Sequence, residues 1–529
     1  MRIALKIRMY KDRLTSKNPF NWVTTTSIVV ANIFLISMLL AGCATAQKQH
    51  TPSQSTAYMN YATTTLGQLF SNAMQQHAGL SGFSIISQGR TAFTARIALT
   101  ELAEKSLDLQ YYLWEEDETG WILADRLVRA ADRGVRVRVL VDDIGLSGRD
   151  ARIAALDSHP NIEIRIFNPL SHRNARLFDF AFDLNRVNHR MHNKIMVADN
   201  AMAIVGGRNI GNHYFGVATD ANFRDLDIAT AGPVVREIST VFDHFWNGSW
   251  AMPINALAEA DEFKTVVEFL HKKIATSDYP FPLDQDVNGL SKELSSIRDG
   301  FIWAPGQIVW DDPKDIEAKA DHGNIYKALY KKLDSLEHEL LIESAYFVAR
   351  EPGIEQVKRL RDRGVKVRVL TNSLASNDVL AAHAGYAKYR KQLLSNGLDI
   401  YEMRPDASVI KKKVLSSKSK AALHTKSFVF DRESVFIGSF NLDPRSSNIN
   451  TEAGLYVESP ALAAKVVEYM NEGVLAENSY QTLLDKNGKL YWITNVDGIE
   501  VRYNKEPETT FGQRFMSGII KLLPFDSQL

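Results

Sequence analysis

The sequence predicts an α/β protein built from two pseudo-twofold-related domains, each a mixed β-sheet flanked by helices. A strand–helix–strand pattern with alternating apolar residues occurs at residues 106–143 and again at 338–370. Gly134 and Gly364 stand at the same position in the two copies, where a helix ends and the next strand begins. With 529 residues, 45% of them hydrophobic, the chain is long enough for two such domains and apolar enough to give each a core.

Residues 1–43 are predicted to be a signal peptide that ends in a lipobox. Basic residues dominate 1–20, an apolar run follows at 23–40, and Leu-Ala-Gly-Cys occupies 40–43. This ending resembles that of bacterial lipoproteins, in which the cysteine, here Cys43, is lipidated and becomes the new N-terminus. The alternative is an uncleaved membrane anchor, although the threonine, serine and asparagine residues of the apolar run disfavour it. Both alternatives place the protein on a membrane, and the lipoprotein places it in the bacterial cell envelope.

The composition divides the rest of the chain into segments. A stretch rich in Thr, Gln, Ser and Ala predicts a tether, and several prolines between the repeats predict an irregular connection. The expected segments are a tether at 44–80, a first domain at 81–255, a connecting segment at 256–320, a second domain at 321–505 and an amphipathic tail at 506–529.

Two features near the end of the chain bear on contact with lipid. Phe511, Phe515, Ile519 and Leu522 share one face of a predicted helix, which suits either an interfacial helix on lipid or packing against the protein itself. Five lysines within 411–420 are expected either to attract anionic headgroups or to lie on a solvated loop.

Charge and cysteine content exclude several classes of function. The 62 basic and 62 acidic residues balance, and removal of residues 1–42 takes away six basic residues and one acidic residue, which leaves a net charge of −5. A non-specific nucleic-acid binder needs a basic excess, so we expect no nucleic-acid partner. Cys43 is the single cysteine, and no group of His, Cys and carboxylate residues has zinc spacing. We therefore predict no disulfide, no metal and no cofactor.

Two copies of the motif H-x-K-x4-D mark the repeats, at 192–199 and 424–431. Gly-Gly-Arg-Asn at 206–209 and Gly-Ser-Phe-Asn at 438–441 are as far apart along the chain as the two motifs are. A single match has a chance of roughly one in twenty, whereas two matches in register with a repeat are not accidental. The complete motif regions are predicted to cover 186–213 and 418–445.

The chemistry of the motif is that of phosphoryl transfer. On a strand, His192 and Lys194 point to one face, as do His424 and Lys426, so each pair can converge on one phosphate. One neutral imidazole can attack phosphorus, and the other can protonate the leaving alcohol and then deprotonate the attacking one. The lysines would neutralise the non-bridging oxygens of the phosphate.

Two carboxylates are predicted to orient the imidazoles. When the repeats are aligned on Pro233 and Pro460, Asp225 pairs with Glu452, and each lies downstream of a motif histidine. A carboxylate on the second ring nitrogen holds an imidazole in one tautomer. Asp227 is a rival to Asp225 for this role.

The remaining motif residues are given supporting roles. Asn209 and Asn441 are expected to donate hydrogen bonds to the phosphate. Asp199 and Asp431 complete the motif and stand as candidate catalytic residues, but their odd separation from the histidine places them on the opposite strand face. A structural role in a turn is favoured over a chemical one.

The paired motifs resemble those of the phospholipase D superfamily, and the resemblance covers nearly all of the chain after about residue 81. Within it the chain is most similar to bacterial cardiolipin synthases of the C type, on the segments 185–194, 438–452 and 523–529. The resemblance implies an active site between the two domains and the histidine, lysine and asparagine roles given above.

The function expected from this resemblance is phosphatidyl transfer between membrane phospholipids through a phosphohistidine. Phosphatidylglycerol or phosphatidylethanolamine would be the lipid partners, the membrane surface would be a further partner, and an activating protein partner is an open alternative. Hydrolysis to phosphatidic acid is the close alternative function. A nuclease-type phosphodiesterase and an inactive scaffold lipoprotein are disfavoured by the acidic charge and by the two intact motifs.

Overall fold

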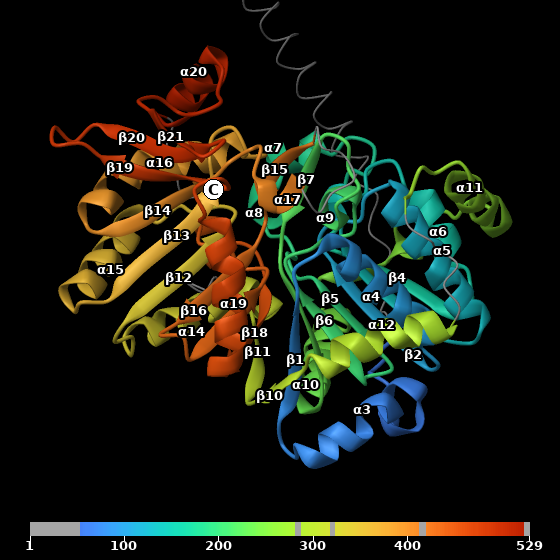
Figure 1. Ribbon diagram of the computed structural model, residues 1–529. Coiled ribbons are helices and arrows are strands. Elements are labelled where there is room, and N and C mark those ends of the chain that lie inside the picture. Colours follow the sequence, from blue (N-terminus) through green and yellow to red (C-terminus); the bar gives the residue numbers. More distant parts are fainter. Residues whose placement is uncertain (1–52, 281–286, 318–322, 412–418, 523–529) are drawn as a thin grey trace, which may run out of the picture.

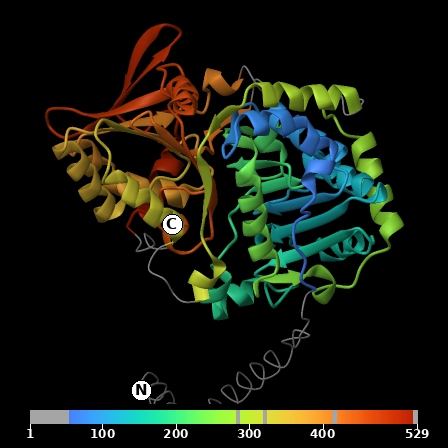
Figure 2. The same cartoon turned by 90° about the horizontal axis from the view of Figure 1, so that it is seen from below.

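The computed structural model describes residues 53–280, 287–317, 323–411 and 419–522. The lipobox with Cys43, most of the lysine segment and the end of the tail lie outside the described residues. Two large β-sheets form two domains that lie side by side (Figures 1 and 2). No helix within the described ranges combines the length and the apolar character that crossing a bilayer requires.

The first domain is built on a nine-stranded mixed sheet. Its central strands β2, β3 and β4 run parallel, and the other pairs are antiparallel. In spatial order the strands are β10 (Ile302–Ala304), β1 (Ser81–Ile86), β8 (Asp227–Ala231), β6 (Met202–Gly206), β5 (Ile195–Ala198), β2 (Ser106–Tyr111), β3 (Arg136–Asp142), β4 (Ile162–Phe167) and β9 (Ala251–Pro253). The helices are α3 (Thr65–Gln76), α4 (Gly89–Leu102), α5 (Glu118–Asp132), α6 (Asp150–Asp157), α7 (Leu177–Phe182), α8 (Leu184–Val187), α9 (Asn212–Phe215), α10 (Pro233–Trp246), α11 (Phe263–Ala275) and α12 (Val287–Asp299).

The second domain repeats this plan on a ten-stranded sheet, again with three central parallel strands. The spatial order is β11 (Gly306–Trp310), β18 (Ala453–Glu458), β17 (Ser434–Gly438), β16 (Lys426–Phe430), β12 (Glu339–Ser344), β13 (Lys366–Asn372), β14 (Leu398–Met403), β19 (Ser479–Leu484), β20 (Leu490–Val496) and β21 (Ile499–Tyr503). The helices are α13 (Pro313–Glu317), α14 (Asn324–Leu333), α15 (Arg350–Asp362), α16 (Leu380–Ser395), α17 (Ser408–Lys411), α18 (Pro444–Asn448), α19 (Pro460–Gly473) and α20 (Phe511–Ile520). The predicted fold class is confirmed.

Gly134 and Gly364, which stand at the same position in the two repeats, have the same backbone conformation. Gly134 follows α5 with φ 91°, and Gly364 follows α15 with φ 82°. This left-handed backbone ends each helix and directs the chain into the parallel strand, a conformation that a residue with a Cβ adopts only at a cost.

Several contacts join the domains, among them a strand pair and a shared core. The short strands β7 (Ala221–Arg224) and β15 (Lys420–Leu423) pair in parallel, one from each domain. A single hydrophobic cluster contains residues of both sheets, among them Val197 and Val205 of the first and Val435 of the second. Because the domains share a core, we expect them to behave as one folding unit.

Two expectations about connecting segments are corrected. From Ser53 onward, the predicted tether packs on the first domain, because α3 buries Leu66 and Phe70 completely (Figure 2). The connecting segment 256–320 is not irregular: it contains α11 and α12, and its strands β10 and β11 complete the edges of the two sheets.

Candidate active site

The two motif histidines lie between the domains, and each is almost buried. His192 is 8% exposed and precedes β5, and His424 is 5% exposed and precedes β16. Backbone contacts fix both to the opposite domain: His192 N donates to Thr451 O at 2.8 Å, and His424 N donates to Arg224 O at 2.8 Å. These acceptors directly precede the two carboxylates that were predicted to orient imidazoles.

Each imidazole is held by the carboxylate of the other domain. His192 Nδ1 lies 2.8 Å from Glu452 Oε2, and His424 Nδ1 lies 2.8 Å from Asp225 Oδ2. In the sequence each carboxylate lies downstream of the histidine of its own repeat, but in the structure each holds the histidine of the other repeat. The physical reason is the backbone pairing across the domain boundary, which places each histidine beside the residue before the opposite carboxylate. Asp227, the rival of Asp225, instead forms a buried ion pair with Arg96 at 2.9 Å.

The two orienting carboxylates have different surroundings. Glu452 accepts hydrogen bonds from Ser439 Oγ and from Ser446 Oγ, the latter at 2.7 Å. At the position of Ser439 the first repeat has Gly207, where an added Cβ would lie 2.1 Å from Asp225 Oδ1. The difference between Gly-Gly-Arg-Asn and Gly-Ser-Phe-Asn therefore follows from the carboxylate that each repeat has to accommodate. This sequence difference was the available signal for Ser439, whose role was not anticipated.

Burial controls the protonation of the imidazoles and their carboxylates. Burial, together with the charges of Lys194 and Lys426, lowers the pKa of His192 well below its usual value, and burial with the same two lysines lowers the pKa of His424 likewise. Burial raises the pKa of Glu452 to about 7, although Lys194 opposes this. A neutral imidazole that donates from Nδ1 to a carboxylate carries its lone pair on Nε2, the nitrogen that can attack phosphorus.

The motif lysines lie in the same site as the histidines. Lys194 Nζ donates to His192 O, and Lys426 Nζ donates to His424 O. Burial lowers the pKa of Lys426 to about 8 and that of Lys194 well below its usual value. Both lysines act on both histidines, so the four side chains form one electrostatic unit. Within the described ranges no group of three or more His, Cys, Asp or Glu residues is arranged to hold a metal ion.

The two asparagines are not equivalent. Asn209 Nδ2 donates to Tyr214 Oη at 2.8 Å, while its Oδ1 accepts from Leu113 N at 3.1 Å, so both ends of the amide are engaged. Asn441 Oδ1 faces Tyr346 N at 3.5 Å, and its Nδ2 has no hydrogen-bond partner among the described residues. Asn441 therefore remains the better candidate for a donor to phosphate, whereas Asn209 positions a tyrosine.

Asp199 and Asp431 lie away from the histidines, at the far ends of β5 and β16. Asp199 accepts three backbone hydrogen bonds, from residues 104–106, and Asp431 accepts three from residues 337–339. Both have positive φ, 52° and 49°. Their place among the candidate catalytic residues is corrected: each fixes the turn after its strand to the start of the neighbouring strand, as the structural alternative describes.

Aromatic side chains that the sequence did not single out form walls of the site. Tyr112 meets His192 edge-on, with ring centroids 4.9 Å apart, and Tyr214 meets His424 in the same way at 5.1 Å. Phe223 stacks on His424 at 5.2 Å. These rings restrict the imidazoles to one orientation and exclude water from their faces.

Comparison with known proteins agrees with this geometry. Residues 97–246 and 329–473 match the family model described as "Cardiolipin synthase, PLD-like domain". The chain is 38% identical over 464 residues to cardiolipin synthase C of Escherichia coli, covering 85% of this chain and 97% of that protein, and 24% identical to a cardiolipin synthase of Clostridium perfringens over 75% and 71% of the two chains. The crystal structure of phosphatidylserine synthase from Haemophilus influenzae has the same fold, with a TM-score of 0.51, 15% identity and coverage of 76% and 89%. The chain therefore belongs to the cardiolipin synthase family of phospholipase D-like phosphatidyltransferases.

Proposed function

We propose that the protein transfers a phosphatidyl group from one membrane phospholipid to the hydroxyl of phosphatidylglycerol, with His192 and His424 sharing the nucleophile and acid–base roles. The observation that carries the proposal is the pair of buried imidazoles, each with Nδ1 on a carboxylate of the other domain, beside two buried lysines. Phosphatidylglycerol or phosphatidylethanolamine serves as donor.

The reaction proceeds in two displacements. Nε2 of one histidine attacks the donor phosphorus, the bond from phosphorus to the headgroup oxygen breaks, and the second histidine gives that oxygen a proton. The second histidine, now neutral, takes the proton of the acceptor hydroxyl while the acceptor oxygen attacks phosphorus and the phosphorus–nitrogen bond breaks. The bound phosphate offsets the lysine charges that lower the pKa of both histidines, so the acid form becomes accessible when substrate is present.

The test separates transfer from hydrolysis. Labelled donor lipid is given to the purified full chain in vesicles with increasing phosphatidylglycerol, with and without a cell extract in case an activating protein is needed. Cardiolipin should increase at the expense of phosphatidic acid, because a bound lipid hydroxyl has the advantage of proximity over water. Phosphatidic acid as the only product in every mixture would make the protein a hydrolytic phospholipase D.

Attachment to the membrane through Cys43 is the second part of the proposal, supported by the lipobox-like segment at 40–43. Cys43→Ser should abolish incorporation of labelled palmitate and leave an uncleaved precursor. Unlabelled parent protein with unchanged electrophoretic mobility would contradict lipidation and favour the membrane anchor.

Two exposed apolar segments support a membrane-facing orientation. In α20, Phe511 is 76% exposed and Phe515 is 56% exposed, and in α7 Phe182 is 84% exposed. Both helices lie at the upper edge of the molecule in Figure 1, where β7 and β15 also lie. Such exposure is costly in water and suits contact with lipid.

A further inference from the structure

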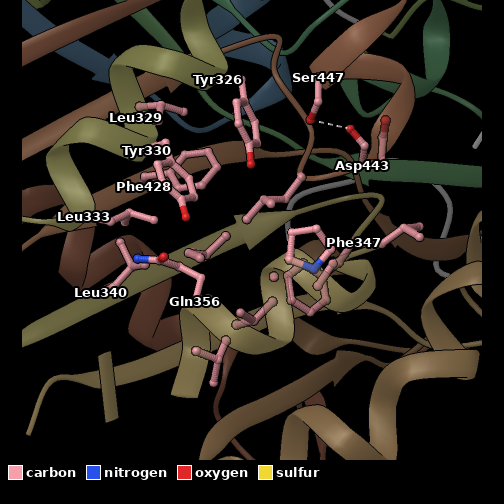
Figure 3. A pocket seen from close by; sticks show the side chains of 18 of the residues that line it. Tyr326, Leu329, Tyr330, Leu333, Leu340, Phe347, Gln356, Phe428, Asp443 and Ser447 are labelled. Atoms are coloured by element: carbon pink, nitrogen blue, oxygen red, sulfur yellow. Dashed lines mark hydrogen bonds between the residues drawn. The ribbon is translucent and has the colours of Figure 1, made fainter. Parts of the chain in front are cut away.

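The second domain contains an apolar cavity that the reaction does not use. It lies between α14, α15 and the sheet, and its volume is about 160 Å³. Tyr326, Leu329 and Tyr330 of α14 face Phe347 and Gln356 across it (Figure 3). An apolar cavity of about 150 Å³ in another protein stays dry and binds benzene, so this one is suited to an apolar group of similar size.

The first domain shows how such a space is closed by the chain itself. Its helix α4 occupies the place that α14 occupies in the second domain, carries the fully buried Ala95 and Ala98, and packs directly on α5 and α12. In the described part of the second domain no counterpart of α12 covers α14, and α14 has no comparable packing on α15. The second domain therefore has an open space at a position that helices fill in the first domain.

The lining of the cavity includes one cation, Arg350, for which the described residues provide no partner. Arg350 is half-buried at the start of α15, has a φ of 51°, and forms no hydrogen bond or ion pair with any described residue. Further along α15, Arg359 donates a hydrogen bond at 2.5 Å to Tyr330 Oη, which also lines the cavity. An unpaired guanidinium next to an apolar cavity is suited to a ligand with an anionic group and a hydrocarbon tail.

We infer that the cavity binds the first carbons of an acyl chain of an anionic lipid, with Arg350 holding the anionic group at the mouth. The family acts at membranes, whose lipids supply such chains. A free fatty acid is the other ligand with this chemistry. The inference rests on the proposed function only for this choice of ligand. The cavity does not contain the histidines, but two of its lining residues are neighbours of site residues in the sequence. Phe440 stands between Ser439 and Asn441, and Asp443 caps α18, the helix that carries Ser446.

Photolabelling tests the site without turnover. The full chain with His192→Ala is mixed with vesicles that contain phosphatidylglycerol bearing a photoactivatable group within the first carbons of one acyl chain, and the labelled peptides are identified by mass spectrometry. Labelling is expected in 324–333 and 350–362. Val357→Trp, which fills the cavity from α15, should reduce it roughly tenfold, and Leu329→Phe from the opposite wall serves if the first variant does not fold.

Two further comparisons identify the headgroup and the source. Arg350→Gln should weaken labelling by phosphatidylglycerol roughly tenfold, the effect of losing one charged hydrogen bond, but not labelling by diacylglycerol with the same chain, which has no anionic group. Arg361→Gln, an exposed change on the same helix, should have no effect. A labelled fatty acid that binds as well as phosphatidylglycerol would identify the free acid as the source. Labelling of 324–362 that is absent, or that both cavity-filling variants leave unchanged, would overturn the inference whatever reaction the enzyme catalyses.

Discussion

At the scale of single residues, each motif histidine is oriented by a carboxylate from outside its own domain. Glu452 is completely buried and holds His192, while two serine hydroxyls hold Glu452 in turn. The carboxylate fixes the tautomer and stabilises the positive charge that an imidazole acquires when it acts as an acid or a nucleophile.

Glu452→Gln should lower kcat by roughly 100- to 10,000-fold, because the amide has the same shape but cannot stabilise that charge. The measurement is cardiolipin or phosphatidic acid formation at saturating lipid. Glu458→Gln, at the exposed end of the same strand β18, is the matched control and should keep full activity. A Glu452→Gln enzyme with nearly normal kcat would remove the carboxylate from the mechanism.

The pH dependence of kcat/KM should be a narrow bell. On the alkaline side Lys426, with its pKa lowered to about 8, loses the proton that lets it neutralise phosphate, so activity falls as pH rises through about 8. On the acid side, protonation of the Glu452–His192 pair, with the pKa of Glu452 raised to about 7, removes the acceptor of Nδ1–H, so activity falls as pH drops below about 7. Lys426→Arg should shift only the alkaline limb of the profile, to higher pH. If that limb does not shift, a group other than Lys426 causes it.

At the scale of elements, α3 is part of the first domain and not of a tether. Thr64 caps its N-terminus by accepting from Gly67 N, and Phe70 stacks on Phe301 with centroids 5.6 Å apart. Leu66 is fully buried one turn earlier. A short helix with two buried apolar side chains, Leu66 and Phe70, is stable only because the domain covers them.

Phe70→Ala should reduce the free energy of unfolding by about 3–5 kcal/mol, the usual cost of removing a buried phenyl ring. Urea unfolding followed by tryptophan fluorescence measures it. Asn72→Ala on the exposed side of α3 is the control and should change stability by less than about 0.5 kcal/mol. A loss below about 1 kcal/mol for Phe70→Ala would mean that α3 contributes little to the fold.

At the scale of the whole molecule, the two domains form one catalyst. The backbone pairing of 190–192 with 451 and of 424 with 224 places one histidine, one lysine and one carboxylate from each domain in a common site. Neither domain alone contains an imidazole together with its orienting carboxylate.

His192→Ala and His424→Ala should therefore each remove nearly all turnover, and the double variant should be scarcely worse, since residues that act as a unit are not additive. Product formation over long incubations, where residual rates are visible, is the measurement. If each single variant kept about half of the activity, the repeats would be independent catalysts.

Much of the site was determined by the sequence itself. The repeat, the strands and the identities of the reactive histidines and lysines follow from local patterns: period-two alternation and motif spacing depend only on residues close along the chain. The turn roles of Asp199 and Asp431 were favoured by their odd separation from the histidine, which depends only on positions close along the chain.

The tertiary structure decided what depends on contacts between distant segments. Which carboxylate serves which histidine, and the engagement of Asn209 by Tyr214, arise from packing across the domain boundary, which no local pattern encodes. The helices α3, α11 and α12 were missed, although α11 and α12 have apolar residues at helical spacing. A short amphipathic helix is stable only when a domain surface covers its apolar face, so the burial of these residues is a property of the assembled fold.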